Sequence, residues 1–297
     1  YCINPFRVNE GREGMPPPSR FNPLDMVDLD GPTVFEDIDL IADALVIVPA
    51  HGDPHWGLSA KSLIRGIIYL VKSEHGDAAN LGMVRDVLTD PDGLPLAKMV
   101  QAGGVAKQAA AQLMAASDKE LGSIISSTIQ QTDWLASDAM REALSASDFD
   151  LMDLKRYKTT LYLVVPLEFV ETHARFLRLF VNLAVKCASR MPRGVPLRIF
   201  LNEFYSLGPM PALLKASANI RSYGVSLWPI IQNIAQLKEH YPANWQTFIA
   251  NSATVQFFAV NDTETLQYAA SRLGQRRLYA KGPGGTQQVG RAPLRTA

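Results

Sequence analysis

The sequence predicts an α/β fold in which a mainly parallel sheet is flanked by helices and interrupted by an all-helical insertion. Two observations predict this fold. From residue 159 onward, short apolar runs typical of strands alternate with segments of helical apolar spacing. Between about residues 74 and 146, by contrast, the chain is rich in Ala, Gln and Ser and carries no strand pattern. Alternating strands and helices need right-handed crossovers, and such crossovers make neighbouring strands parallel.

The first 73 residues open as though partway through a strand, without an initiator Met. A Gly- and Pro-rich loop follows over residues 9–23. The apolar spacing of residues 35–48 predicts a helix, and Asp53 with Pro54 supplies the N-cap and first-turn proline of a second helix. We expect residues 1–73 to be the first part of the α/β domain, truncated at its N-terminus.

Residues 74–146 are expected to form a separate, all-α insertion domain. A loop at residues 90–95, which contains Pro and Gly, divides this stretch. Ser117 and Glu120 have the spacing of a capping box, which predicts a helix running from there toward Trp134.

Residues 147–297 are expected to be the second part of the α/β domain, truncated at its C-terminus. The run at residues 197–201 is almost wholly apolar, which indicates a strand covered on both faces. The basic stretch 272–295 contains several glycines and is expected to form a hairpin or a tail, with contact to DNA phosphates as the weaker alternative. The patterns predict strands at residues 161–165, 197–201, 225–231 and 255–260 and helices at residues 169–191, 211–221 and 243–251.

Bulk composition excludes several classes of protein. The formal net charge is zero, which provides no general attraction to nucleic acid or anionic membranes. Cys2 and Cys187 are the only cysteines and lie far apart, as in proteins of a reducing, cytoplasmic compartment. No apolar run approaches the ~18 residues that indicate a membrane-spanning helix. A metal site at His51, Asp53 and His55 is an alternative, but the helix start already accounts for Asp53.

Four polar residues lie where the predicted strands and helices end. Asn202 and Glu203 come directly after the strand at 197–201, and Gln232 comes directly after a later strand. Ligands of open parallel sheets bind beyond the carboxyl ends of the strands. Arg221 ends the intervening helix, so we expect it at the opposite edge of the sheet, pointing toward a neighbouring subunit. The plainer alternatives are a solvated Glu203, a Gln232 bonded to backbone, and an Arg221 placed by the helix dipole.

These residue types match the needs of ATP hydrolysis. An apolar strand that ends in Asp-Glu is the Walker B pattern of ATP-driven motors, and Asn202 stands where Asp is usual. Hydrolysis needs a carboxylate that orients water, an amide that senses the γ-phosphate and a cation that stabilises the transferred charge. Glu203, Gln232 and Arg221 supply these three groups, and an arginine finger from a neighbouring subunit can add ~10³ to 10⁵ in rate.

Several blocks of the sequence, in their order and spacing, resemble the TraG-like coupling proteins of type IV secretion and conjugation. The resemblance covers nearly the whole chain and is weakest in the helical insertion. The most specific blocks are LNEFYSLG at 201–208, IRSYGV at 220–225 and IQNIAQL at 231–237. Further matching blocks lie at residues 4–6, 21–25, 53–56, 147–150, Tyr241 and 251–258.

The resemblance implies a RecA-like motor ATPase that assembles as a homo-hexamer at the cytoplasmic face of the bacterial inner membrane. Such a motor would use ATP and Mg²⁺ to recruit DNA–relaxase complexes or effector proteins and pass them to the type IV secretion channel. It implies that Glu203 is the catalytic carboxylate, Gln232 the γ-phosphate sensor and Arg221 the finger. Asn202 would be the Mg²⁺-associated position. The two flanking segments would form the nucleotide-binding domain, and the helical insertion would recognise substrate.

Two departures from the family pattern bear on activity. The chain contains no Gly-Lys pair and hence no Walker A loop; in the family that loop and the membrane helices precede the point where this chain starts. Asn202 brings no negative charge to hold Mg²⁺ and would contact it only through a metal-bound water. We therefore expect hydrolysis in a full-length parent and none by this segment alone.

Two other functions stay open on the sequence. One is an inactive substrate-binding or scaffolding module of the same system, and the other is a related RecA-type DNA-pumping ATPase. For the segment itself we expect unpaired strand edges and exposed apolar surface, because part of the sheet would be missing.

Overall fold

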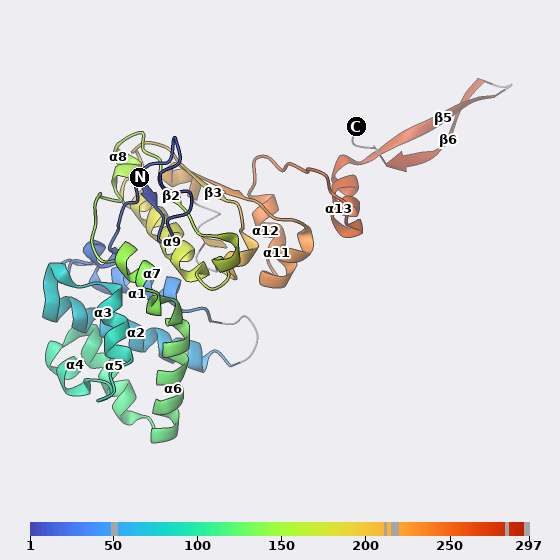
Figure 1. The fold of residues 1–297 in the computed structure, drawn as a ribbon. Helices are drawn as coiled ribbons and strands as arrows, with labels where there is room; N and C mark the ends of the chain where they lie inside the picture. The colour runs from blue at the N-terminus through green and yellow to red at the C-terminus, as the bar shows by residue number, and fades with distance from the viewer. Residues whose placement is uncertain (49–52, 211–212, 215–219, 283–284, 294–297) are drawn as a thin grey trace. The chain divides into compact units, whose positions relative to one another are not determined.

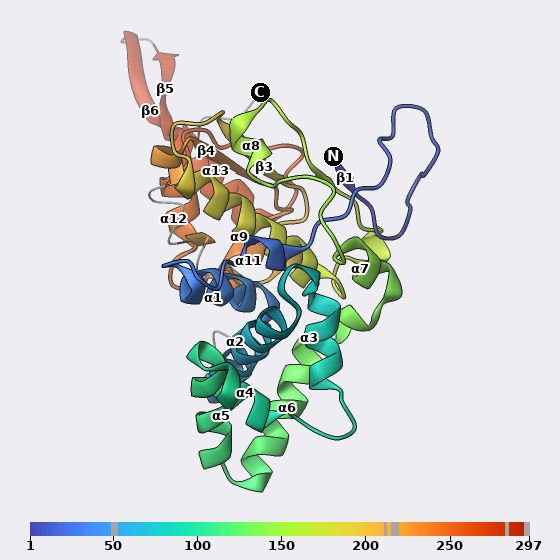
Figure 2. The same ribbon diagram turned by 90° about the vertical axis from the view of Figure 1, so that its left-hand side faces the viewer.

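The computed structural model of the chain describes residues 1–48, 53–210, 213–214, 220–282 and 285–293. The chain divides into two compact units, Tyr1–Trp228 and Pro229–Ala297, and each is described by itself. Figures 1 and 2 show the helices and strands in two views. The α/β fold class that the sequence predicts is confirmed. The division into three segments at residues 73 and 146 stays a prediction.

The first unit opens with β1 (Cys2–Ile3), which pairs in parallel with β2 (Tyr162–Leu163). The chain therefore starts in a strand, as the sequence predicts. The second helix starts at His55, next to the predicted Asp53 and Pro54, but its N-cap is Pro54 rather than Asp53. The carboxylate of Asp53 still accepts a hydrogen bond from the backbone N–H of His55 at 2.9 Å. The elements that follow β1 are η1 (Pro23–Met26), α1 (Val34–Leu45) and α2 (His55–His75).

Residues 76–143 are described throughout and contain helices and connecting loops but no strand. Ser117 Oγ accepts a hydrogen bond from the backbone N–H of Glu120 at 3.3 Å, so the N-cap half of the predicted capping box is present. The helices between residues 76 and 131 gather around α2 in both views (Figures 1 and 2). The helices of residues 76–143 are η2 (Gly76–Ala78), α3 (Leu81–Leu88), α4 (Leu96–Ala102), α5 (Gly104–Ala115), α6 (Asp118–Gln131), η3 (Asp133–Ala136) and α7 (Asp138–Ala143).

Direct packing of α2 on α5 depends on a residue without a side chain. An ideal Cβ built on Gly66 of α2 would lie 2.5 Å from the Cβ of Ala109 on α5. Real Cβ atoms do not approach each other so closely, so Gly66 lets the two helix backbones lie nearer than any other residue would allow.

The rest of the first unit carries the second strand pair. The long helix predicted at residues 169–191 forms as α9 (Ala174–Arg190), which starts five residues later than predicted and packs against α1. β3 (Leu197–Leu201) and β4 (Val225–Pro229) are hydrogen-bonded neighbours. The backbone N–H of Leu197 donates to the carbonyl of Gly224 at 2.9 Å, so the two strands start side by side. The shorter elements are α8 (Asp153–Arg156), η4 (Leu167–Phe169), η5 (Tyr205–Leu207) and η6 (Ile220–Tyr223).

The second unit combines helices with a hairpin. The backbone N–H of Ile234 donates to the hydroxyl of Thr265 at 3.1 Å and so joins its first and last helices. The helix predicted at residues 243–251 is confirmed, and the basic stretch after residue 272 forms the antiparallel hairpin, one of its two expected forms. The elements are α11 (Ile234–His240), α12 (Trp245–Ala250), α13 (Thr263–Leu273), β5 (Gln275–Gly282) and β6 (Gly285–Pro293).

Several strand predictions are wrong in extent or burial. No strand forms at residues 255–260, where Phe258 is 80% exposed. A strand is stable only when a neighbour bonds to its backbone, and no strand of the described residues pairs with this segment. β2 is shorter than predicted, and Tyr162 on it is exposed rather than buried. β4 ends at Pro229, two residues before the predicted Ile231.

The strand at residues 197–201 forms where predicted but is not covered on both faces. Leu197 and Leu201 are buried, whereas Phe200 is 59% exposed. The ring of Phe200 lies 5.5 Å from that of Trp228 on β4, which is also exposed. The expected exposed apolar surface is therefore present on this strand pair. Most of the helix predicted at residues 211–221 lies outside the described residues.

The hydrophobic core of the first unit lies between α1, α2 and α9. Burial raises the pKa of the Cys187 thiol to about 11, so this thiol is protonated at neutral pH. Of the helices that the structure describes, none has the length and apolar character to cross a membrane. The fully buried core side chains include Ile38, Ile41, Leu63, Ile64, Ile67, Phe176 and Leu179.

Candidate functional site

Asn202 and Glu203 occupy the turn that directly follows β3, and both are exposed. The backbone carbonyl of Glu203 accepts a hydrogen bond from the N–H of Ser206 at 3.1 Å, which closes the turn. Phe204 is only 2% exposed and anchors the turn in the interior. The turn thus fixes the backbone next to Glu203 while its carboxylate faces solvent, where it can reach a ligand.

A buried arginine holds the end of this turn. Arg178 of α9 is 2% exposed and donates to the carbonyls of Leu207 at 3.0 Å and Pro209 at 2.7 Å. Its Nε donates to the carbonyl of Ala44 at 3.3 Å, and Nη2 donates to the carbonyl of Asp43 at 3.4 Å, both at the end of α1. One guanidinium therefore ties the turn after β3 to two helices.

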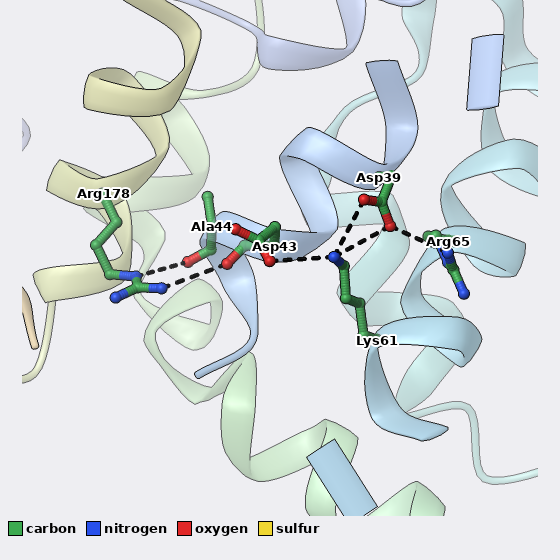
Figure 3. A network of polar contacts seen from close by, with 6 residues as sticks. All are labelled: Asp39, Asp43, Ala44, Lys61, Arg65 and Arg178. Atoms are coloured by element: carbon green, nitrogen blue, oxygen red, sulfur yellow. Dashed lines mark hydrogen bonds and ion pairs between the residues drawn. The ribbon is translucent and has the colours of Figure 1, made fainter. Parts of the chain in front are cut away.

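The end of α1 is in turn held by α2, as Figure 3 shows. Lys61 donates to the carboxylates of Asp39 and Asp43 at 3.1 and 3.0 Å, and Arg65 donates to Asp39 at 3.0 Å. These side chains are partly exposed, so each ion pair contributes on the order of 1 kcal/mol or less. Their main effect is to hold the end of α1 in position, and with it the backbone carbonyls that Arg178 binds.

Arg221 lies in η6, immediately before β4, and is exposed. Because β3 and β4 start side by side, Arg221 lies near the start of β3 and Glu203 follows its end. Each residue of a strand adds ~3.3 Å, so a strand of this length separates them by well over the reach of a hydrogen bond. The structure does not bring Glu203 and Arg221 together within one chain.

A second buried cation holds the segment of Arg221. Lys155 is fully buried, and its Nζ donates to the carbonyl of Tyr223 at 3.0 Å. Its own carbonyl accepts from the N–H of Val195, just before β3, at 2.7 Å. An ideal Cβ on Gly194 would lie 2.4 Å from that carbonyl, so this close contact requires glycine. Burial lowers the pKa of the Lys155 amine.

Gln232 lies in a bend after β4 and is exposed. Its backbone N–H donates to the side-chain carbonyl of Gln236 at 2.9 Å, and Asn233 caps α11 by accepting from the N–H of Gln236. Gln232 belongs to the second compact unit and Glu203 to the first. The convergence of the Gln232 amide with Glu203 therefore stays a prediction.

The side chains near β3 that could serve as metal ligands suit only a contact mediated by metal-bound water. Asn202 offers an amide and Glu203 one carboxylate, and across the described part of the chain no three His, Cys, Asp or Glu side chains gather in a metal-binding group. Mg²⁺ normally keeps several waters and binds one or two carboxylates plus substrate phosphates. His51, one member of the alternative metal site, lies outside the described residues.

Lys155 and Arg178 are not among the residues that the sequence marks as functional. Arg178 interrupts an otherwise apolar part of α9, between Leu177 and Leu179, and this interruption is a signal of a buried charge. Lys155 gives no comparable signal, because it sits in a short, mostly charged helix. Its role depends on contacts with residues 40 and 68 positions away.

The family model for type IV secretory system conjugative DNA transfer matches residues 14–282. The probable conjugal transfer protein TraG of Sinorhizobium fredii is 27% identical over 276 residues, which cover 87% of this chain and 43% of that protein. The protein VirD4 of Rhizobium rhizogenes is 31% identical over 147 residues, 48% of this chain and 22% of that protein. The chain thus spans less than half the length of these curated relatives.

The fold is shared with solved structures of the bacterial conjugative coupling protein TrwB. One of them, in complex with sulphate, has a TM-score of 0.71 at 15% sequence identity, over 93% of this chain and 64% of that one. Other TrwB structures contain a non-hydrolysable ATP analogue, or ADP with Mg²⁺. The resemblance seen in the sequence is confirmed: the chain belongs to the family of type IV secretory system conjugative DNA-transfer proteins, which includes the TraG and VirD4 coupling proteins.

Proposed function

We propose that this chain is the motor portion of a type IV coupling protein, which recruits DNA–relaxase complexes or effector proteins and drives their transfer with ATP. The observation that carries the proposal is Glu203, an exposed carboxylate on a firmly held turn at the end of β3. Family membership supports the conjugative role, and the nucleotide complexes of TrwB support ATP and Mg²⁺ as cofactors.

In this proposal each candidate residue has one task. Glu203 accepts a hydrogen bond from the attacking water and orients it. Arg221 reaches the site of the adjacent subunit, which agrees with its distance from Glu203 in its own chain. Gln232 senses the γ-phosphate, and Asn202 contacts a metal-bound water. When bound, ATP would supply the phosphoryl group, and Mg²⁺ would neutralise part of the charge on the phosphates.

We further propose a homo-hexamer at the cytoplasmic face of the inner membrane, in contact with channel components of the secretion system. A subunit whose finger cannot reach its own site needs a neighbour, and a ring provides one for every subunit.

A second candidate is a module of the same system that binds substrate without hydrolysing ATP. Asn202 favours it, because an amide in the Walker B position adds no negative charge beside the metal. A RecA-type DNA pump used in another process is a more distant candidate, and the match to the conjugative family over residues 14–282 disfavours it.

The test is Glu203→Gln in a full-length coupling protein that carries this segment. We expect the variant to bind ATP normally and to lose hydrolysis by roughly 100-fold or more, since the group that orients water is gone. Normal hydrolysis in Glu203→Gln would overturn the assignment of the base. If the unchanged protein and its Asn202→Asp variant both bind ATP without hydrolysing it, the second candidate replaces the first.

A further inference from the structure

Two buried cations of the first unit make the same kind of contact, and the roles proposed for Glu203, Arg221, Gln232 and Asn202 do not explain it. Lys155 is fully buried and Arg178 is 2% exposed, and both donate to backbone carbonyls of loops. The loop that Lys155 binds carries Arg221, and the loop that Arg178 binds carries Glu203. Each loop therefore has a buried cation of its own.

A structural role alone does not account for Lys155. Lys186, another buried lysine of the first unit, pairs with the carboxylate of Asp37 at 2.7 Å. For Lys155, no ion pair is found among the residues that the structure describes, so its charge is balanced only by the carbonyl of Tyr223. Burying such a charge costs several kcal/mol, and an apolar side chain of the same size would avoid that cost.

The contact of Lys155 is placed where it can set the direction of Arg221. Tyr223 is the last residue of η6, and the N–H of Gly224 donates back to the carbonyl of Arg221 at 3.0 Å. Gly224 has a φ of +66°, so the chain turns sharply at this point. Fixing the carbonyl of Tyr223 therefore fixes the whole turn that presents Arg221.

Arg178 acts on the other loop in the same way. Its Nη1 binds the carbonyls on both sides of Gly208, which has a φ of +68°, and thereby fixes the far end of the turn that begins at Glu203. Its Nε and Nη2 donate to carbonyls of α1, and the ion pairs of α2 hold α1 in place (Figure 3).

We propose that Lys155 and Arg178 are positioning residues for ATP hydrolysis: Lys155 orients the finger Arg221 toward the neighbouring subunit, and Arg178 orients the base Glu203 within its own subunit. The inference rests on the proposed function. Neither cation touches the nucleotide, and each acts through one loop.

The first test measures amide hydrogen exchange in a full-length coupling protein without nucleotide. Lys155→Met should speed exchange by roughly 10-fold in residues 220–225 and leave residues 203–210 unchanged, and Arg178→Met should do the reverse. Lys186→Met is the matched control, since it removes a buried cation that contacts neither loop, and it should change neither segment. Equal effects of Lys155→Met and Arg178→Met on both loops would overturn the inference.

The second test uses mixed hexamers. Mixing Glu203→Gln with Arg221→Ala subunits should restore hydrolysis to about a quarter of the normal rate, because about one interface in four then pairs an intact base with an intact finger. Lys155→Met subunits should recover with Glu203→Gln but not with Arg221→Ala. Arg178→Met subunits should recover with Arg221→Ala but not with Glu203→Gln.

The outcomes separate the two proposals. If the Glu203→Gln and Arg221→Ala mixture stays inactive, the shared site fails and the positioning roles fail with it. If that mixture recovers while Lys155→Met and Arg178→Met recover with both partners or with neither, only the positioning roles are wrong. Should the Met variants not assemble, Lys155→Arg and Arg178→Lys carry the same tests, since each keeps a donor but changes its reach.

Discussion

The helices α2–α6 and the strand pair β3–β4 differ in how far their large apolar side chains are exposed to solvent. In α2, Ile64, Ile67 and Ile68 are fully buried, whereas Phe200 of β3 and Trp228 of β4 are 59% and 43% exposed. A helix satisfies its backbone hydrogen bonds within itself and needs only packing, while a strand pair needs further strands or a covering layer. The core face of α2 is therefore covered by its neighbouring helices, whereas the strand pair keeps an apolar face exposed among the described residues.

Outside the candidate site, the largest loss of stability is expected when the buried ion pair between α1 and α9 is broken. Asp37 pairs with Lys186 at 2.7 Å and with Arg190 at 2.7 Å. Asp37→Asn should lower the free energy of unfolding by about 3–5 kcal/mol at pH 7, because it leaves Lys186 buried without its anion. Urea unfolding of the two proteins measures the difference. A loss below ~1 kcal/mol would mean that the pair is not buried in solution.

The same pair gives a pH dependence. Burial alone would raise the pKa of Asp37, but its hydrogen bonds with Lys186 and Arg190 outweigh burial and hold the pKa below its usual range. A depressed carboxylate pKa stabilises the fold at pH values above the unfolded value of about 3.9. The advantage of the unchanged protein over Asp37→Asn should stay constant from neutral pH down to about pH 5 and shrink as the pH falls below 4. If the stability advantage of the unchanged protein grows as the pH falls, the pKa of Asp37 is raised rather than lowered and the prediction is wrong.

Truncating a buried and an exposed side chain of α2 tests how much the core face of this helix contributes to stability. Ile67→Ala in α2 should lower the free energy of unfolding by about 2–5 kcal/mol, because Ile67 is fully buried and leaves a cavity. Leu58→Ala on the same helix is the control, since Leu58 is 55% exposed, and it should change stability by less than about 0.5 kcal/mol. Similar losses in both variants would show that the exposed face of α2 is covered.

A smaller effect tests how far α6 depends on its own local signal. Ser117→Ala removes the oxygen that accepts from the N–H of Glu120 and should cost about 1 kcal/mol. Ser126→Ala, at an exposed serine inside α6, should change stability by no more than about 0.5 kcal/mol. If the two substitutions have equal effects, the cap does not stabilise this helix.

The smallest change in stability is expected on the open strand face. Phe200→Ser should alter the free energy of unfolding by no more than about 0.5 kcal/mol and should reduce self-association, measured by light scattering. Leu197→Ser, at the buried end of the same strand, should destabilise by several-fold more. A large loss with Phe200→Ser would show that another surface covers β3, and the two regions would no longer differ.

The sequence predicts the helices better than the strands, for a physical reason. Asp53 at the start of α2 and Ser117 at the start of α6 act on backbone groups two or three residues away. Such contacts are visible in the sequence, as is the apolar spacing of α9. The segment 255–260 is as apolar as β3 but forms no strand, because strand formation depends on a distant partner that its own residues do not specify.

The candidate site divides in the same way. The sequence marks Asn202, Glu203, Arg221 and Gln232 as residues that follow or precede strands, and their exposed positions next to β3 and β4 agree with that reading. The contacts that hold their loops are long-range in sequence. Lys155 reaches Tyr223, 68 residues away, and no local pattern encodes that contact.

The close approach of α2 and α5 at Gly66 has a consequence for how this region can vary. A methyl group on residue 66 would overlap the methyl group of Ala109 and would also lie 2.8 Å from Cε of Met99. Gly66→Ala is therefore tolerated only if the helices separate, or if Ala109 is replaced by Gly and the flexible end of Met99 moves aside. The pair is expected to change together among homologous chains, with one small partner always offsetting a larger one. The geometry thus constrains the combined volume of the two side chains rather than the identity of either one.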